Sequence, residues 1–301
     1  MVRAHQSLVG LSCGDAFGER FFLPDEVAVP LINQRAMPAP PWFFTDDTLM
    51  ALSIVSILGE HGRIDQDQLA MSFAVNHDPS RGYGAAMHKL LPRIRQEGGS
   101  WRDEAKKLFG GEGSFGNGSA MRVAPLGAFF ADDLERAAKE AELSSVTTHT
   151  HPEAVAGAVA VAVAAGLAWQ SRQSGSKPES TEFLEEVYQR TPTSEVHLRI
   201  RRAINLPAKA SVSRAASVLG TGMQVTAQDT VPFALWTAAR HLDSYEDAMW
   251  TTLSGLGDRD TTCAITGGIV VMYTGTESIP QEWLDSREPL PSWILKSKNL
   301  I

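Results

Sequence analysis

The sequence contains little cysteine. Its two cysteines, Cys13 and Cys263, lie far apart among 301 residues and form no CxxC spacing. This usage argues against a disulfide framework and against a zinc ribbon. A reducing cytoplasm is the compartment that fits it best.

An excess of basic charge is also absent. The chain carries 27 Lys and Arg against 35 Asp and Glu, a formal net charge of −8. Broad electrostatic binding of nucleic acid or of an anionic lipid surface requires a basic face. The overall charge therefore disfavours both kinds of partner, although a local basic pocket stays open.

Long hydrophobic runs are missing as well. The most apolar segment, residues 154–169, is mostly Ala, Val and Gly and is shorter than the roughly 20 residues that cross a membrane. We interpret it as a core helix. The N-terminus has Arg3 and His5 but no apolar core with a cleavage site, so we expect no signal peptide.

Helical periodicity, in contrast, recurs along the chain. Hydrophobic content of 43% and charged content of 21% are ordinary for a globular protein, and apolar residues repeat at spacings of three and four. We therefore expect an all-α fold in a single domain, residues 1–301. Helices are predicted over 46–58, 64–76, 83–97, 132–145, 152–172, 181–190, 196–205, 230–242, 245–255 and 260–273.

Two acidic clusters each precede a predicted buried helix. Thr45, Asp46 and Asp47 follow three aromatic residues in the stretch "WFFTDDTLMAL". Asp258, Asp260 and Thr261 occupy the same kind of position in "GDRDTTCAITGG". Adjacent carboxylates repel one another, and burial favours protonation unless a positive charge lies nearby. The identity of that positive charge is the question that the clusters raise.

Either cluster alone is explained by helix capping, because Asp and Thr are favoured at helix N-termini. Four carboxylates and two hydroxyls together exceed any capping requirement. If the clusters converge, they form a site for hard cations such as Mg²⁺ or Mn²⁺, which prefer oxygen ligands. Such cations would supply the missing positive charge.

A glycine-rich stretch, "GSFGNGSAMR", occupies residues 113–122. Successive backbone amides freed by glycine can cradle an anion. The stretch lacks the GK[ST] of a Walker loop and the preceding strand of a dinucleotide fingerprint. A plain turn and a phosphate cradle are equally open on these local grounds.

Two histidines, His149 and His151, precede a predicted helix that begins at Pro152. Metal ligation is one interpretation of the pair, and a polar lining or a helix cap is the more common one. Among the aromatic residues, Phe115 and Tyr83 are candidates to stack on a base, whereas most aromatic side chains are simply core.

With these residues in view, the chain resembles the ADP-ribosylglycohydrolase family. The motifs that carry the resemblance occur in family order from residue 8 to about 275, and they are specific in combination. They are "GLSCGDAFG", "FTDDTLMA", "RGYGAAMHKLL", "GSFGNGSAMRVAPLG", "TTHTHPEAVAGA" and "GDRDTTCAITGGIV". Their spacing is most similar to the branch that hydrolyses serine-linked and O-acetyl-linked ADP-ribose.

The resemblance implies an all-helical enzyme with two divalent cations, Mg²⁺ or Mn²⁺. It assigns metal ligation to Thr45, Asp46, Asp47, Asp258, Asp260 and Thr261. It assigns contacts with ADP-ribose to Gly113, Ser114, Phe115, Gly116, Asn117, Gly118, Ser119, Met121 and His149, with Tyr83 added as an aromatic candidate. The expected catalytic carboxylates are Glu19, Asp47 and Asp258.

One position departs from the branch pattern. A glutamate near the scissile bond follows the "GD" motif in the serine-type branch, and Phe22 stands at the aligned position. Glu19 is the nearest carboxylate, and we expect residues 15–19 to leave the first helix into a loop beside the cleft. Either Glu19 replaces that glutamate, or the metals and aspartates act without it.

The function implied is hydrolytic removal of ADP-ribose from an acceptor by cleavage at C1″. The expected partner is an ADP-ribosylated protein or a small-molecule adduct, with nucleic acid only as an ADP-ribosylated end, and the expected state is a monomer. Two rivals stay open: an inactive member that binds ADP-ribose or keeps the fold, and a two-metal phosphoesterase.

Overall fold

The computed structural model describes residues 1–96 and 100–291, and their regular structure is helical. Sixteen α-helices and three short 3₁₀ helices occur in these ranges, with two isolated bridges and no β-strand. The expectation of an all-α fold is confirmed.

Every helix predicted from periodicity is present. Nine of the ten both begin and end within three residues of the expected bounds. The third begins at Met87 instead of residue 83. Gly82, with φ of +84°, adopts a left-handed conformation just ahead of this stretch, and Glu97 lies outside the described residues. These helices are α3 (Asp46–His61), α4 (Gln66–Val75), α5 (Met87–Gln96), α8 (Leu134–Ser145), α9 (Pro152–Ser174), α10 (Ser180–Arg190), α11 (Glu195–Ile204), α13 (Ala227–Arg240), α14 (Tyr245–Leu253) and α15 (Arg259–Thr274).

Other helices carry weaker sequence signals. They are α1 (Val2–Glu19), α2 (Asp25–Asn33), α6 (Trp101–Lys107), α7 (Ala124–Phe129), α12 (Val212–Leu219) and α16 (Gln281–Ser286), with 3₁₀ turns at η1 (Leu108–Gly111), η2 (Asn117–Ser119) and η3 (Thr276–Ser278). The prediction that residues 15–19 leave the first helix is wrong, because α1 continues to Glu19.

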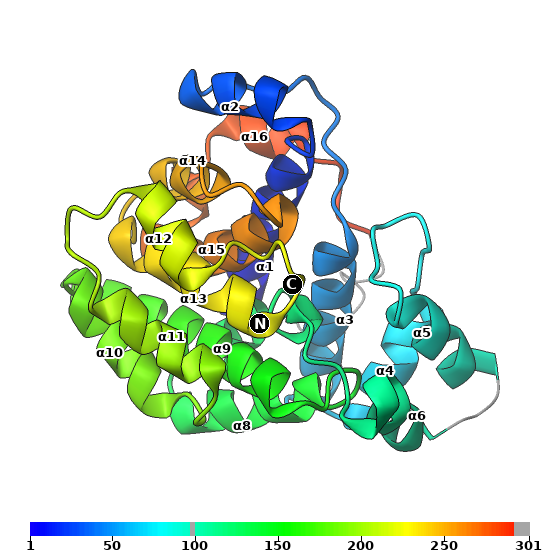
Figure 1. Cartoon of the computed structure of the whole chain (residues 1–301). Helices are drawn as coiled ribbons and strands as arrows, with labels where there is room; N and C mark the ends of the chain where they lie inside the picture. Colours follow the sequence, from blue (N-terminus) through cyan, green and yellow to red (C-terminus); the bar gives the residue numbers. More distant parts are fainter. Residues whose placement is uncertain (97–99, 292–301) are drawn as a thin grey trace.

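A close contact between α1 and α15 explains this difference. A Cβ atom on Gly10, Gly14 or Gly18 would lie only 2.5, 2.3 or 2.2 Å from a backbone oxygen of α15. Glycine at every fourth position thus lets two helix backbones approach without intervening side chains. This contact stabilises a helix whose glycines disfavour it locally. The two helices cross the centre of the molecule (Figure 1).

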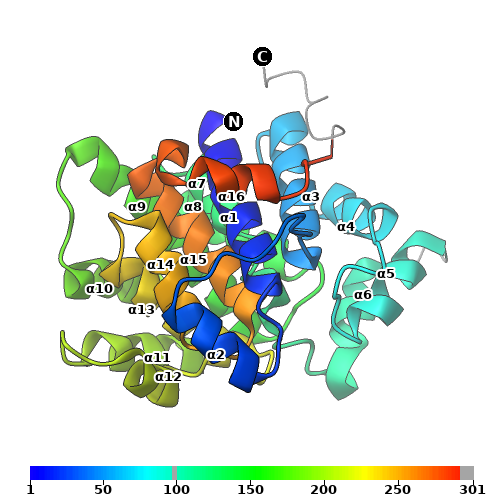
Figure 2. The same ribbon diagram turned by 90° about the horizontal axis from the view of Figure 1, so that it is seen from above.

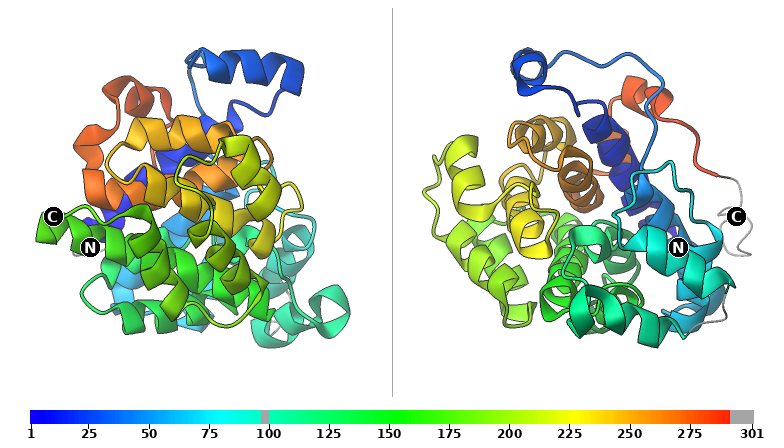
Figure 3. Two further views of the ribbon diagram at one scale, coloured as in Figure 1. Left: turned by 60° about the vertical axis from the view of Figure 1, so that its left-hand side comes forward. Right: turned by 45° about the vertical axis from the view of Figure 1, so that its right-hand side comes forward.

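The remaining helices are arranged around this central pair. Helices α10, α11 and α12 lie on one flank and α4, α5 and α6 on the opposite flank, as two perpendicular views show (Figures 1 and 2). Helix α2 projects from the body at one end (Figure 3). The site described below lies between these flanks, because its residues come from the central helices and from loops on either side.

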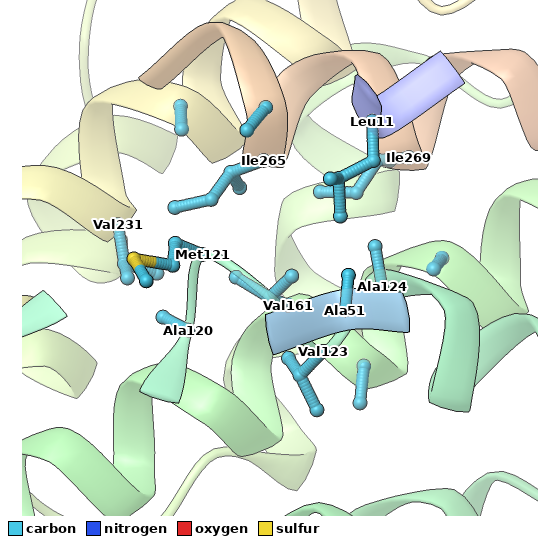
Figure 4. Close-up of a cluster of buried hydrophobic side chains, with 14 of the residues drawn as sticks. Leu11, Ala51, Ala120, Met121, Val123, Ala124, Val161, Val231, Ile265 and Ile269 are labelled. Atoms are coloured by element: carbon cyan, nitrogen blue, oxygen red, sulfur yellow. The ribbon is translucent and has the colours of Figure 1, made fainter. Parts of the chain in front are cut away.

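The core is continuous across these elements. Side chains from α1, α3, α7, α9, α13 and α15 meet in one buried cluster (Figure 4). Helix α9 spans 23 residues, longer than the apolar run expected from sequence, and it is long and apolar enough to cross a membrane. However, 78% of its apolar window is buried inside the protein, as in a core helix. The single-domain organisation stays a prediction that this continuous core supports.

Long-range contacts position the start of α3. Trp42 is buried beside Phe17, at a ring-centroid distance of 5.6 Å, and its backbone exchanges hydrogen bonds with Ser286 and Glu288. The Glu288 carboxylate also accepts from the Phe44 amide and pairs with Arg81. The carbonyl of Arg81 in turn accepts the amide of Asp46 at 2.7 Å. Packing of the C-terminal segment thus fixes where α3 begins.

The helix contact predicts the effect of adding one methyl group at Gly10. In Gly10→Ala the new Cβ would lie 2.5 Å from the oxygen of Gly267 and from Val271, so the two helices must separate. We expect a loss of about 1–3 kcal/mol in the free energy of unfolding, measured by denaturant titration. Gly84→Ala is the matched control, because nothing lies within 4 Å of its Cβ position. Equal stability of the two variants would contradict close packing of α1 on α15.

Candidate active site

Three helix termini meet at one cleft of about 690 Å³. The end of α1 contributes Glu19, the first turn of α3 contributes Asp46 and Asp47, and the start of α15 contributes Asp258 and Asp260. The glycine-rich loop forms another part of the wall. The structure therefore brings together the two acidic clusters and the loop, which lie far apart in the sequence.

Asp15 organises the acidic end of this cleft. It is fully buried, and its two carboxylate oxygens accept the amide and hydroxyl of Thr45 and the amide and hydroxyl of Thr48, at 2.5 to 3.1 Å. A carboxylate that accepts several donors in this way holds its partners rigidly. Asp15 thus fixes the first turn of α3, which carries Asp46 and Asp47. Asp15 was not among the expected site residues, because residues 15–19 were expected to form a loop, whereas α1 continues to Glu19.

Asp47 joins the two clusters. Its Oδ2 lies 3.0 Å from the Thr45 hydroxyl oxygen, whose single hydrogen is shared with Asp15, and it accepts from the Thr261 hydroxyl at 3.4 Å. Its Oδ1 is buried and has no hydrogen-bond partner within residues 1–96 and 100–291. Carboxylate oxygens of Asp15, Asp47 and Asp260 lie within 4.8 Å of one another. The predicted convergence of the two clusters is therefore present in the structure.

The electrostatics of the cluster are unfavourable without an added cation. Burial, followed by the charge of Asp260, raises the pKa of Asp15 to about 7 and raises the pKa values of Asp46, Asp47 and Asp258 well above the usual range. In the described part of the chain, no Lys or Arg forms an ion pair with these carboxylates. Crowded oxygen donors with one orphaned oxygen fit a hard divalent cation.

The glycine-rich loop is tied to this acidic end. The Asn117 side chain donates to Asp258 at 2.6 Å and to Thr230 at 3.0 Å, so it links the loop to the start of α15. Gly116 and Gly118 lie against the imidazole of His149, and a Cβ on Gly118 would come within 2.9 Å of its Nε2. Glycine is needed here because the loop passes directly over that ring.

Most of the predicted ligand-binding residues line the cleft, but three do not. Ser114, Phe115, Gly116, Asn117, Gly118, Met121 and His149 are at its wall. Ser119 is buried and donates to the Ala154 carbonyl at 3.0 Å, which fastens the loop to α9. Gly113 lies against Thr150, and Tyr83 is buried against His77. The structure therefore gives these three residues packing contacts outside the cleft wall.

The two histidines occupy different environments. His151 is the N-cap of α9, and its Nδ1 accepts from the Glu153 amide at 3.1 Å. His149 is buried at the cleft wall, and burial followed by the charge of Arg122 lowers its pKa to about 3. Neither belongs to the group of close metal-ligand atoms, which consists of Asp15, Asp47 and Asp260. The geometry favours a lining role for His149 and a cap for His151.

Glu19 and Phe22 both line the cleft. Burial, followed by the charge of Asp260, raises the pKa of Glu19 to about 7. Phe22 is 47% exposed, and the guanidinium of Arg259 lies 5.7 Å from its ring centroid. The Glu19 side chain is exposed to solvent and lines the cleft from the last turn of α1.

The structure adds Phe109, which sequence analysis missed. Phe109 lines the cleft, is 53% exposed, and lies 5.4 Å from Phe115 between ring centroids. The two rings form an exposed apolar wall suited to stacking on a flat group. Phe109 has a left-handed backbone conformation, with φ of +51°. A phenylalanine does not indicate such a conformation, so the sequence contained no signal for its position.

Known proteins resemble this chain in sequence and in fold. The family model for ADP-ribosylglycohydrolase matches residues 2–299. ADP-ribosylhydrolase ARH3 of Homo sapiens is 28% identical over 326 aligned residues, which cover 93% of this chain and 88% of that protein. ADP-ribosylarginine hydrolase Tri1 of Serratia proteamaculans is 26% identical over 294 residues, 94% of this chain and 74% of that protein.

A solved structure supports the fold. A chain described as an ADP-ribosylglycohydrolase-related protein complex superposes with a TM-score of 0.67, at 22% identity, covering 100% of this chain and 97% of its own. Since the family model spans nearly the whole sequence, the protein belongs to the ADP-ribosylglycohydrolase family and is an ADP-ribosyl hydrolase, an enzyme of the glycosidase class.

Proposed function

We propose that this enzyme depends on two divalent cations, Mg²⁺ or Mn²⁺, and cleaves the bond between C1″ of ADP-ribose and an acceptor. The observation that carries the proposal is the close approach of carboxylate oxygens from Asp15, Asp47 and Asp260, beside the cleft that Asp46 and Asp258 also line. A cleft of about 690 Å³ beside them is of the size that holds a nucleotide-like ligand.

The residues that would hold the cations are the predicted ones, Thr45, Asp46, Asp47, Asp258, Asp260 and Thr261. Asp15 adds a further role, since its four accepted hydrogen bonds keep Thr45 and the start of α3 in place. When bound, the cations would orient the distal ribose and make an attacking water more acidic.

Two groups of residues would contact the part of ADP-ribose that lies away from the cations. Backbone amides of Ser114, Phe115 and Gly118 would bind the pyrophosphate, as glycine-rich loops do for anions, whereas the amides of Gly116 and Asn117 donate to Ser114 Oγ and to the Val225 carbonyl. Phe109 and Phe115 would pack against the adenine. Glu19 has a raised pKa and faces the cleft, so it would protonate the leaving group or orient water near the scissile bond.

The acceptor is the open part of the proposal. One relative is named for ADP-ribosylarginine and others more generally as ADP-ribosylhydrolases. A release assay over serine-, arginine- and acetyl-linked ADP-ribose decides the linkage. Release of inorganic phosphate instead would favour the phosphoesterase, and binding of ADP-ribose without any release would favour an inactive member.

The free, buried cysteines support our further proposal of a reducing, cytoplasmic location.

Metal dependence is tested by chelation and by one aspartate. EDTA should abolish release of ADP-ribose, and Mg²⁺ or Mn²⁺ should restore it. Asp47→Asn should lower turnover by at least about 10²-fold and abolish the rise in Tm that Mg²⁺ gives the wild type, because it removes charge from the centre of the cluster. Glu282→Gln, an exposed carboxylate on α16, is the control. Full turnover in chelator would rule out the two-metal mechanism.

The loop is tested at Gly118. In Gly118→Val the added side chain meets the His149 ring, so the loop must move away from it. We expect ADP-ribose binding to weaken by about 1–3 kcal/mol in calorimetry, the scale of lost hydrogen bonds to a charged ligand. Far-UV circular dichroism confirms that the variant is folded. Unchanged affinity for ADP-ribose would show that the loop is a structural turn and does not bind the ligand.

Glu19 is tested by Glu19→Gln, which keeps size and polarity but removes the ionisable group. If Glu19 acts in catalysis, turnover on an O-linked substrate should fall at least about tenfold, within the usual contribution of a general acid or base. ADP-ribose affinity should stay nearly the same. If turnover is unchanged, Glu19 is a solvated residue at the cleft edge and the metals and aspartates do the chemistry.

A further inference from the structure

Arg122 has an unusual environment for a guanidinium. It is fully buried, stacks 4.3 Å from the Phe73 ring centroid and contacts the Met50 sulfur. Its hydrogen-bond acceptors are neutral: Nη2 donates to the Ser144 carbonyl at 3.1 Å and to the Thr148 hydroxyl at 2.9 Å. Among the described residues no carboxylate pairs with it. A buried charge of this kind is costly, which raises the question of what it does for the protein.

The hydroxyl of Thr148 connects Arg122 to His149. Its oxygen lies 2.7 Å from His149 Nδ1 and is itself fully buried. A guanidinium can only donate, so one lone pair of the hydroxyl accepts from Arg122. The single hydrogen of Thr148 then needs an acceptor. Within the described part of the chain, His149 Nδ1 is the acceptor in reach.

The opposite direction of this bond is unfavourable. If Nδ1 carried a proton and donated it to Thr148, the hydroxyl would accept twice and its own hydrogen would be buried without a partner. Such an unsatisfied donor costs about 1–3 kcal/mol. The hydrogen-bond network therefore places the imidazole proton on Nε2, the nitrogen on the far side of the ring.

Nε2 lies against the glycine-rich loop. Cβ positions built on Gly116 and Gly118 fall 3.3 and 2.9 Å from it, and His149 lines the cleft there. An Nε2–H group at this place adds a fixed donor to the backbone amides of the same loop. Together they form a set of neutral donors that an anionic group can accept from.

We infer that Arg122, acting through Thr148, is a positioning residue that holds His149 as the neutral Nε2–H tautomer and so makes it a permanent hydrogen-bond donor to a phosphate group held by the glycine-rich loop. The inference rests on the proposed binding of ADP-ribose for the identity of that phosphate. The tautomer itself is a property of the free protein.

The arrangement has a physical advantage over a charged histidine. The buried guanidinium lies beside the imidazole, so a second positive charge on the ring would be repelled and poorly solvated. A neutral donor keeps its hydrogen bond without that cost. It also needs no change of protonation when the anion binds.

The tautomer can be measured directly by ¹⁵N NMR of histidine-labelled full-length protein at neutral pH, with the His149→Gln spectrum used for assignment. We expect wild-type His149 to carry its proton on Nε2, with Nδ1 showing the shift of a hydrogen-bond acceptor. A protonated Nδ1 in the wild type overturns the inference.

Two variants at Thr148 test the link to binding. Thr148→Val removes the donor to Nδ1, so the acceptor shift of Nδ1 should disappear and ADP-ribose affinity should fall about tenfold, since the ring loses its orientation. Thr148→Ser keeps the hydroxyl, so it should keep the acceptor shift of Nδ1 and the wild-type affinity for ADP-ribose. If Thr148→Val keeps wild-type affinity and the wild-type Nδ1 shift, Thr148 does not position His149.

Arg122 is tested by Arg122→Met, which keeps the apolar stem and removes the donors. Thr148 is then free to accept, so the Nδ1–H tautomer should appear, whereas a spectrum that stays wholly Nε2–H in the folded variant overturns the role of Arg122. Folding is checked by circular dichroism, and the Thr148 pair decides the inference if this variant does not fold. Should the wild type fail to bind ADP-ribose at all, the proposed function fails, while the NMR result still decides the tautomer.

Discussion

Repulsion among five aspartates, three of them buried and two half-buried, is the constraint on which the rest of the structure depends. Asp15 accepts hydrogen bonds from four donors, whereas Asp47 Oδ1 has no partner among the described residues. The cluster can form only because the surrounding helices are stabilised elsewhere, above all by the close packing of α1 on α15. The stability of the core thus offsets the cost of a site that an added cation would relieve.

A positive charge, the guanidinium of Arg122, is buried behind the residues that line this site. Arg122 contacts Met50, one turn along α3 from Asp46, yet it hydrogen bonds only to neutral groups. A direct ion pair between Arg122 and an aspartate would occupy carboxylate oxygens that a metal needs. From this position the guanidinium lowers the pKa of Asp46, against the larger opposing effects of burial and neighbouring carboxylates, and donates to the hydroxyl of Thr148 beside His149.

Local sequence patterns predicted the parts of the fold that local forces control. Helix α3 has a long apolar repeat, Thr45 as its N-cap and Gly62 in a left-handed conformation at its end, so its bounds could be read from the residues. The end of α1 could not, because glycines at positions 10, 14 and 18 lower its intrinsic helix propensity. Only the approach of α15, more than 240 residues later in the chain, makes that segment a helix and turns Asp15 inward.

The residue types set the available chemistry: two oxygen-rich clusters, a glycine-rich loop and a histidine before α9 supply donors and acceptors suited to cations and an anion. Packing between distant segments determines which of these side chains reach the cleft. Asn117 bonds to Asp258 across 141 residues, while Ser119, two positions along, is buried against α9. Residue type fixes what a side chain can donate or accept, whereas its direction and partners depend on packing between segments distant in sequence, which no local pattern encodes.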